Sequence, residues 1–505
     1  MSPRPSPGPG PARRAAGLGA GALLAAGAVA LTAWTGPAPA APTQEVGAAD
    51  IDAPAGVVTY GCPAAPANTL GGIDVRQAVS TTTITPVGPP ASLTYAGRAV
   101  SATSSTPATL TGAQGSGGGI LTVSPSDDGR PAGAAGAAIS VADAGDLRGL
   151  AAAPCSPARS AAWIVGGSTA LGSSAELRLT NPGVTTVTAH VRLYGSAGAI
   201  SLPSNGEVVV EPGKTSSLLL ESAGAADPRI ALSVESDGGS VVPALVTEGL
   251  DGETPAGVEM LTPGASPATE QTIPVVATAK AAEQGSEAVS GATSSDEPVL
   301  RVVNPGDSPA TVSVMLSGSA GPSPLPGAQA VPIDPGSVFD ITLTGIDPGV
   351  YGIQVTSDAP VSAAARMVRV GGELPAGSGS LVHDVAWSQA AAPGALASAT
   401  ALLPRDGVSP GLVISSTANE ARTVALASPD GSWSTTVDIP AGTSATAQVP
   451  TGVSAVRLSA ADPDGLSAAV LLTRKASGEA AGALIAVLPV IPDSASQTST
   501  RISLD

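Results

Sequence analysis

An internal repeat of 123 residues is the feature that most limits how this 505-residue chain can fold. The segment "LRLTNPGVTTVTAHVRLYGSAG" begins at Leu177, and "LRVVNPGDSPATVSVMLSGSAG" begins at Leu300. The same offset relates "VEPG" (210–213) to "IDPG" (333–336), so the register holds without a gap. A weaker third copy begins at Leu412. Each copy is therefore expected to form a similar structural module.

Within a copy, the apolar residues recur with the period of a β-strand. Ala189, Val191 and Leu193 alternate with the polar side chains between them, which is typical of a half-buried strand. Similar short runs follow one another at intervals of about 8–12 residues, the spacing of a sandwich or barrel. We therefore predict an all-β protein of tandem, immunoglobulin-like β-sandwich modules. The alternative is a β-propeller, because the 123-residue offset could hold two or more blades of about 40–50 residues.

The repeat and the changes in composition along the chain divide it into six parts. We expect a signal peptide or membrane anchor at 1–41 and a loose tail at 493–505. Between them we expect an N-terminal β-rich unit that contains both cysteines, followed by three β modules, at 52–158, 160–262, 270–372 and 393–492.

The composition limits both the core and the partners. Aromatic residues make up only 2% of the chain, so its cores must be small and aliphatic. The formal net charge is −18, and such an acidic chain repels phosphate backbones. We expect no binding to nucleic acid.

The amino terminus has the layout of an export signal. Arg13 and Arg14 precede an apolar run at 15–34, and Ala38-Pro39-Ala40 offers a small-x-small cleavage pattern. The run is also long enough to span a bilayer, so a cleaved signal and a retained anchor both remain open. In either case, the rest of the chain is expected to lie outside the cytoplasm.

The two cysteines, Cys62 and Cys155, both follow this segment. An even number of cysteines in an exported chain predicts a disulfide bond. No histidine or cysteine lies at ligand spacing from either residue, which disfavours a metal site.

Several short motifs resemble catalytic or nucleotide-binding residues but do not fit those sites. Gly213-Lys214-Thr215 resembles the end of a phosphate loop, yet the second copy reads Gly-Ser-Val there, so we predict a β-turn. His190 is expected to be an exposed strand residue. His383 and Asp384 are neighbours in an extended segment, so they should point to opposite faces. We predict no catalytic residues, no cofactor and no metal.

Tryptophan is the remaining candidate for ligand contact. Trp163 and Trp387 precede module starts, which favours packing over ligand stacking. Trp433 lies in the hairpin "PDGSWSTT" and is the most exposed of the three by expectation. It is therefore our candidate for contact with a ligand.

The segment "SAAWIVGGSTALGSSAELRLTNPG" (160–183), preceded by a cysteine and by an early "CPAAP", resembles the DUF5719 family of uncharacterised secreted actinobacterial proteins. The resemblance covers roughly 55–490. It implies an exported or membrane-anchored envelope protein with no assigned activity, in a family associated with neighbouring envelope glycosyltransferase genes. Related chains often carry a cysteine just after the tryptophan, whereas this one has Ile164 and Val165.

Together these features favour a non-enzymatic structural or interaction protein of the cell envelope. An envelope protein or a polysaccharide is the expected partner, and residues 15–34 would contact the membrane if they are not removed. The alternative is a carbohydrate-binding or carbohydrate-processing accessory of an envelope glycosyltransferase, with Trp433 or Trp387 in a groove.

Overall fold

The computed structural model describes residues 49–52, 55–66, 78–111, 118–279, 297–478, 480–496 and 499–502. These ranges contain β-strands and short 3₁₀ turns but no α-helix, so the all-β prediction is confirmed. Within them, no helix is long and apolar enough to cross a membrane. The predicted signal or anchor at 1–41 lies outside the described residues.

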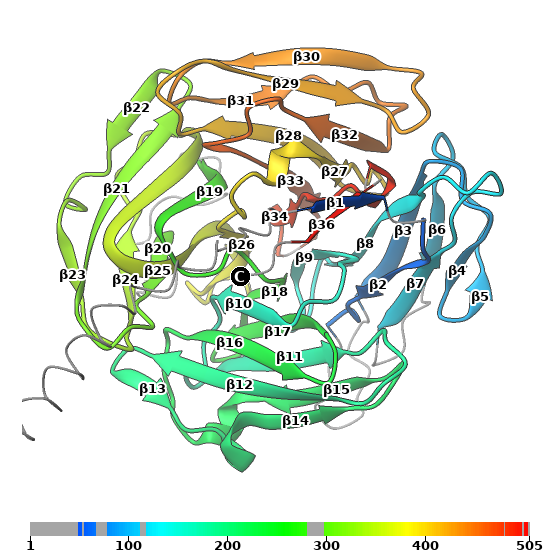
Figure 1. Ribbon diagram of the computed structural model, residues 1–505. Helices are drawn as coiled ribbons and strands as arrows, with labels where there is room; N and C mark the ends of the chain where they lie inside the picture. The colour runs from blue at the N-terminus through cyan, green and yellow to red at the C-terminus, as the bar shows by residue number, and fades with distance from the viewer. Residues whose placement is uncertain are drawn as a thin grey trace, which may run out of the picture. The chain divides into compact units, whose positions relative to one another are not determined.

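The chain forms two compact parts. In the smaller one, β1 (Ala49–Asp52) pairs antiparallel with β36 (Ser499–Ile502), which belongs to the segment expected to be a loose tail. The larger one, Pro54–Thr498, holds all the other strands and is called the body below (Figure 1).

The body begins with an N-terminal module of two sheets. Its outer sheet has the order β2 (Val58–Cys62), β7 (Gly119–Val123), β4 (Leu93–Tyr95), β5 (Arg98–Ala99). Its inner sheet has the order β6 (Ala108–Thr111), β3 (Val79–Val87), β8 (Gly133–Ala142), β9 (Gly149–Pro154).

The first repeat module has the same arrangement. Its outer sheet runs β10 (Ala161–Val165), β16 (Ala231–Asp237), β12 (Val187–Gly195), β13 (Gly198–Ile200), with β14 (Glu207–Val210) also on β12. Its inner sheet runs β15 (Thr215–Leu219), β11 (Ser173–Thr180), β17 (Val242–Asp251), β18 (Thr254–Leu261). Two 3₁₀ turns, η1 (Pro203–Gly206) and η2 (Leu220–Ala223), lie between strands.

The second repeat module uses one long strand in both of its sheets. This strand, β25 (Gly349–Glu373), pairs in the outer sheet with β19 (Ala268–Thr278) and β21 (Ala310–Gly318), and β21 also holds β22 (Gly321–Pro324) and β23 (Val331–Ile333). The inner sheet runs β24 (Val338–Thr342), β20 (Val299–Val303), β25, β26 (Leu381–Gln389). Strand β26 thus lies beyond residue 372, where the expected second module ends.

The third repeat module completes the body. Its outer sheet runs β30 (Ser434–Ile439), β29 (Arg422–Ala427), β32 (Ala455–Ser459), β27 (Ala399–Leu402), β35 (Ile491–Pro492). Its inner sheet runs β31 (Ser444–Ala447), β28 (Ser409–Ser416), β33 (Leu466–Ala476), β34 (Gly482–Pro489). The 3₁₀ turns η5 (Ala395–Ala397) and η6 (Ser494–Ser496) flank it in sequence.

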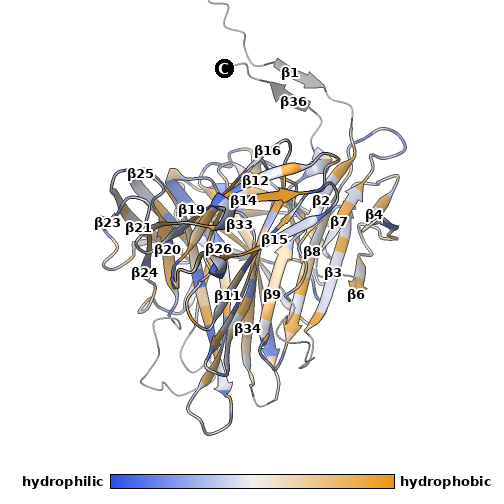
Figure 2. Ribbon diagram, turned by 90° about the horizontal axis from the view of Figure 1, so that it is seen from below, coloured by the Kyte–Doolittle hydropathy of each residue, from blue (hydrophilic) through white to orange (hydrophobic). Residues whose placement is uncertain are grey.

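In each repeat module, the two sheets pack face to face over an aliphatic core. In the first, Val191 and Leu232 of the outer sheet share a core with Leu177 and Leu245 of the inner sheet. Apolar and polar residues are interleaved along the strands, as the period of two predicts (Figure 2). The alternative of a propeller is wrong, because each repeat in the described ranges makes two packed sheets instead of separate single-sheet blades.

The last inner strand of every module lies at the centre of the body (Figure 1). Strands β9, β18, β26 and β34 contact one another in this order, and β34 also contacts β9. Their backbones are joined only sparsely, since β18 and β26 share a single parallel bridge between Ala256 and His383. Many backbone groups at the centre therefore need other partners.

Side chains of the inner sheets connect neighbouring modules. Arg178 of β11 donates to the carbonyl oxygens of Ala64 and Ala65 in the N-terminal module, at 3.0 and 3.1 Å. Arg301, the residue 123 positions later, donates to the carbonyl oxygens of Gly167 and Pro228 in the first repeat module, at 2.6 and 3.1 Å. The repeat thus places an arginine at the same kind of module boundary twice.

Candidate functional site

The predicted disulfide is confirmed. Cys62 ends β2 of the outer sheet, Cys155 follows β9 of the inner sheet, and the two sulfur atoms are bonded. Both residues are fully buried. A buried structural disulfide is typical of an oxidising, extracytoplasmic environment.

Two of the three candidate tryptophans serve in packing. Trp387 is 6% exposed, and the guanidinium groups of Arg301 and Arg366 lie 4.9 and 5.9 Å from its ring centre. Trp163 stacks on Tyr194 with ring centres 5.5 Å apart. Trp387 therefore has no free face for a sugar ring in this structure.

Trp433 lies at the hairpin between β29 and β30. It is half-buried, and its side chain packs against the core of the third module. Its backbone N–H donates to Ser428 Oγ at 3.0 Å, which holds the turn. Contact between Trp433 and a ligand stays a prediction.

The structure places the remaining sequence candidates in strands and turns. His190 Nε2 lies 3.2 Å from Asp237 Oδ2 on the solvent side of β12. Gly213 has a φ of 68°, a left-handed conformation suited to glycine, in the tight turn between β14 and β15. This turn confirms the β-turn predicted for Gly213-Lys214-Thr215. The described residues contain no cluster of three or more metal-ligating side chains.

Sequence reasoning considered Asp384 only beside His383, and it did not predict the polar groups buried at the centre of the body. Asp384 of β26 is fully buried, and its two carboxyl oxygens accept from the backbone N–H groups of Leu150 at 3.3 Å and Ile485 at 2.7 Å. It thereby joins β26 to β9 and β34. The signal in the sequence is one acid directly before the apolar run "VAW" of a predicted strand.

Glu259 of β18 likewise accepts hydrogen bonds from backbone N–H groups, including those of β9 and β26. One carboxyl oxygen accepts from Met260 N at 2.8 Å and Ala152 N at 3.5 Å, and the other from Trp387 N at 3.4 Å. Together with Asp384, it gives partners to backbone N–H groups where the inner strands do not pair with each other. These hydrogen bonds account for two acids in an aliphatic centre.

Burial sets the protonation of both acids. Desolvation raises the pKa of Asp384 to about 8 and raises that of Glu259 well above its usual range. Nearby, Arg148 is also buried and donates from Nε to the Ala480 carbonyl oxygen at 2.8 Å. The carboxyl groups are enclosed and engaged with the backbone, so they hold the strands together and have no open face for a substrate.

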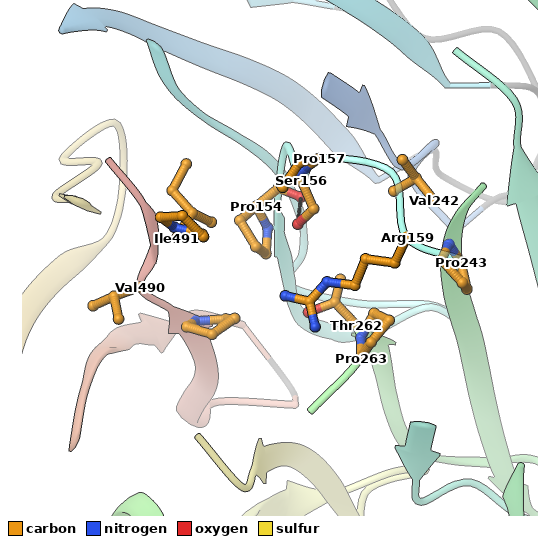
Figure 3. A pocket seen from close by; sticks show the side chains of 12 residues that line it. Pro154, Ser156, Pro157, Arg159, Val242, Pro243, Thr262, Pro263, Val490 and Ile491 are labelled. Atoms are coloured by element: carbon orange, nitrogen blue, oxygen red, sulfur yellow. Dashed lines mark hydrogen bonds between the residues drawn. The ribbon is translucent and has the colours of Figure 1, made fainter. Parts of the chain in front are cut away.

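A small cavity lies where three of the inner strands end. Its volume is about 40 Å³, and proline residues supply half of its wall. The lining residues come from the end of β9 and the chain after it, the start of β17, the chain after β18, and the end of β34 with β35 (Figure 3): Pro154, Ser156, Pro157, Arg159, Val242, Pro243, Thr262, Pro263, Pro489, Val490, Ile491 and Pro492.

Arg159 supplies the one charged side chain of this wall. Its side chain extends between Pro154 and Thr262 (Figure 3). Its backbone is held by a pair of hydrogen bonds to Val241, at 2.8 and 3.0 Å. Partial burial lowers the pKa of its guanidinium, and no carboxylate offsets this effect. The cavity is therefore a small, rigid site with one cation.

Comparisons with known proteins add little on function. No curated protein matches the chain. Two solved structures show weak similarity. One is a bacterial ice-binding adhesin studied for host cell surface retention. It is 12% identical, and the match covers 64% of this chain and 90% of that one, with a TM-score of 0.10. The other is the Streptomyces avermitilis alpha-L-rhamnosidase complexed with L-rhamnose, 10% identical, covering 86% of this chain and 55% of that one, with a TM-score of 0.12. At these scores, neither carries an argument.

One family model matches residues 109–450, about two thirds of the chain, from the inner sheet of the N-terminal module into the third repeat module. The matched segment contains Cys155, both arginines that connect modules, both central acids and Arg159. The chain belongs to the family of unknown function DUF5719.

Proposed function

We propose that this protein is a non-enzymatic structural and binding component of the cell envelope. The observation that carries the proposal is the use made of its buried charges. Asp384 and Glu259 have the largest upward pKa shifts among the acids of the described part. Their carboxyl oxygens accept hydrogen bonds from backbone N–H groups of neighbouring strands. Such a centre supports a rigid scaffold, and general acid–base catalysis needs an accessible group instead.

The proposed location is the outer side of the cytoplasmic membrane. The disulfide supports export, and the basic, apolar segment at 1–41 supports a signal or an anchor. The proposed partner is an envelope protein or a polysaccharide. In the second case, Trp433 is the residue whose indole would contact the sugar.

Crosslinking in intact cells of the producing organism tests this role. The full chain, tagged at its C-terminus, is crosslinked, captured and analysed for attached protein and glycan. Wall-stripped cells are treated in parallel with protease and with a thiol reagent that does not cross membranes.

We expect the body to be accessible to the protease, Cys62 and Cys155 to be unreactive until a reductant is added, and one partner to be enriched. An enriched protein assigns an accessory role, whereas glycan alone assigns direct glycan binding. A chain that stays in the cytosol with both thiols reactive contradicts the proposal.

A further inference from the structure

Within the described part of the chain, Arg159 differs from the other arginines at the module boundaries in having no acceptor for its guanidinium. Arg178 and Arg301 each form an ion pair with a carboxylate, at 2.6 and 2.8 Å, and Arg148 donates to backbone carbonyl oxygens. Among the described residues, the Arg159 guanidinium has neither a hydrogen bond nor an ion pair. The cavity wall partly buries this guanidinium, and a charge drawn partly out of water gains stability from a counter-ion, so an anion that enters the cavity would pair with it.

The cavity around Arg159 is suited to one small group. On the same measure, a water molecule needs about 10–15 Å³, so a volume of about 40 Å³ holds a carboxylate or phosphate group but not a sugar ring. The proline walls have fixed φ angles and no N–H of their own, which makes the site rigid before any ligand arrives. A ligand would insert its charged group and keep the rest outside.

The donors of the cavity match an oxyanion. A guanidinium presents a planar fork of N–H groups that binds carboxylate or phosphate with two parallel hydrogen bonds. Ser156 and Thr262, which carry hydroxyl groups, line the same wall. Ser156 Oγ donates only a long bond of 3.4 Å, to the Pro154 carbonyl oxygen, so it can turn toward a ligand.

We propose that Arg159 and this cavity form a binding site for a pendant oxyanion, a carboxylate or phosphate group carried by a ligand outside the chain. The site lies at the ends of β9, β18 and β34, where three modules meet, so a bound anion would contact all three. This inference goes beyond the proposed function and stands whether or not the protein acts in the envelope.

Thermal unfolding of the purified full chain tests the site. The probes are inorganic phosphate, acetate and glucuronate, each at about 10–50 mM, with neutral glucose and sodium chloride of matched ionic strength as controls. We expect Tm to rise by about 1–2 °C with at least one anion, because a ligand that binds only the folded state stabilises it. The phosphate and carboxylate arms show which group the site prefers.

Two variants identify the residue. In Arg159→Gln we expect no loss of Tm without anion, since an unpaired cation is removed, together with loss of the anion-dependent rise. Arg192→Gln, which removes an equal charge from a side chain that is 67% exposed, should keep that rise.

If the wild-type Tm does not respond to any anion, or if Arg159→Gln retains the response, the site is wrong. A large drop in the Tm of Arg159→Gln without anion would mean that Arg159 is a structural residue, which also overturns the proposal. Arg159→Lys is a third variant: it keeps the charge but not the planar fork of N–H groups, so we expect it to fold and to show a reduced rise in Tm. A full response in Arg159→Lys would contradict bidentate binding.

Discussion

Asp384 and Glu259 show what a single side chain does where strands meet without pairing. Each carboxyl group accepts hydrogen bonds from backbone N–H groups of other modules. The donors belong to β9 and β34 for Asp384, and to β9 and β26 for Glu259. The N–H groups that these carboxyl groups bind are buried, so each needs a partner within the protein. Burial disfavours the ionised form of both acids, so each stays protonated in the folded protein up to its raised pKa.

This protonation predicts a pH dependence that Asp384→Asn should remove. The pKa of Asp384 is about 8 in the folded state and about 3.9 in an unfolded chain. Between these values, only the folded state holds the proton, so the free energy of unfolding falls as pH rises, by up to about 1.4 kcal/mol per pH unit. Below pH 4, both states are protonated and the stability is fully present.

We expect urea unfolding of Asp384→Asn between pH 4 and 8 to show a shallower fall than the wild type. The variant should also lose about 1–2 kcal/mol, because an amide NH₂ cannot accept from the second backbone N–H. The raised pKa of Glu259 leaves some slope in place. Glu211→Gln, a change at an exposed acid, is the control that should leave the slope as it is. An unchanged slope in Asp384→Asn would show that Asp384 is ionised in the folded protein.

At the scale of elements, one position of the repeat connects modules. Arg178 of β11 and Arg301 of β20 lie 123 residues apart, and each reaches carbonyl oxygens of the preceding module. The third copy has Val413 there, which packs in the core of the second module. The same boundary is thus held by charge in two copies and by an apolar contact in the third.

Arg301→Met should be strongly destabilising. Arg301 is 1% exposed, and its loss leaves the Asp340 carboxylate and the carbonyl oxygens of Gly167 and Pro228 without their donor. Removal of one partner of a buried pair costs about 3–5 kcal/mol. Urea unfolding followed by circular dichroism measures the loss, and Arg192→Met, at an exposed pair, should change stability by less than about 0.5 kcal/mol. Equal stabilities of the two variants would mean that the boundary does not depend on Arg301.

At the scale of the whole molecule, the disulfide closes the N-terminal module on itself. The bonded residues are 93 apart in sequence, and β2 to β9 lie between them or contain one of them. This module also packs against both ends of the row of repeats, through Arg178 of the first and through the contact of β9 with β34 of the third. Loss of the disulfide should therefore weaken the contacts that the N-terminal module makes with the first and third repeat modules.

The double variant Cys62→Ala/Cys155→Ala tests this dependence. A closed loop of 93 residues predicts a loss of about 4.6 kcal/mol relative to the oxidised wild type. Unfolding of the reduced wild type should match that of the variant, since both lack the same constraint. If oxidised wild type and variant unfold at the same urea concentration, the N-terminal module is held by its packing alone.

The repeat and its period of two were enough to predict an all-β protein, the face of β12 that is buried, and the β-turn at Gly213, because these depend on neighbours in sequence. The disulfide followed from two cysteines in an exported chain. The N-terminal module was not recognisable as a fourth copy, although its strand order is the same, since no motif of the repeat survives in it. The roles of Asp384, Glu259 and Arg159 could not be predicted either. The surroundings of each come from strands of three modules, and burial and partners at such a meeting point are decided by tertiary packing alone.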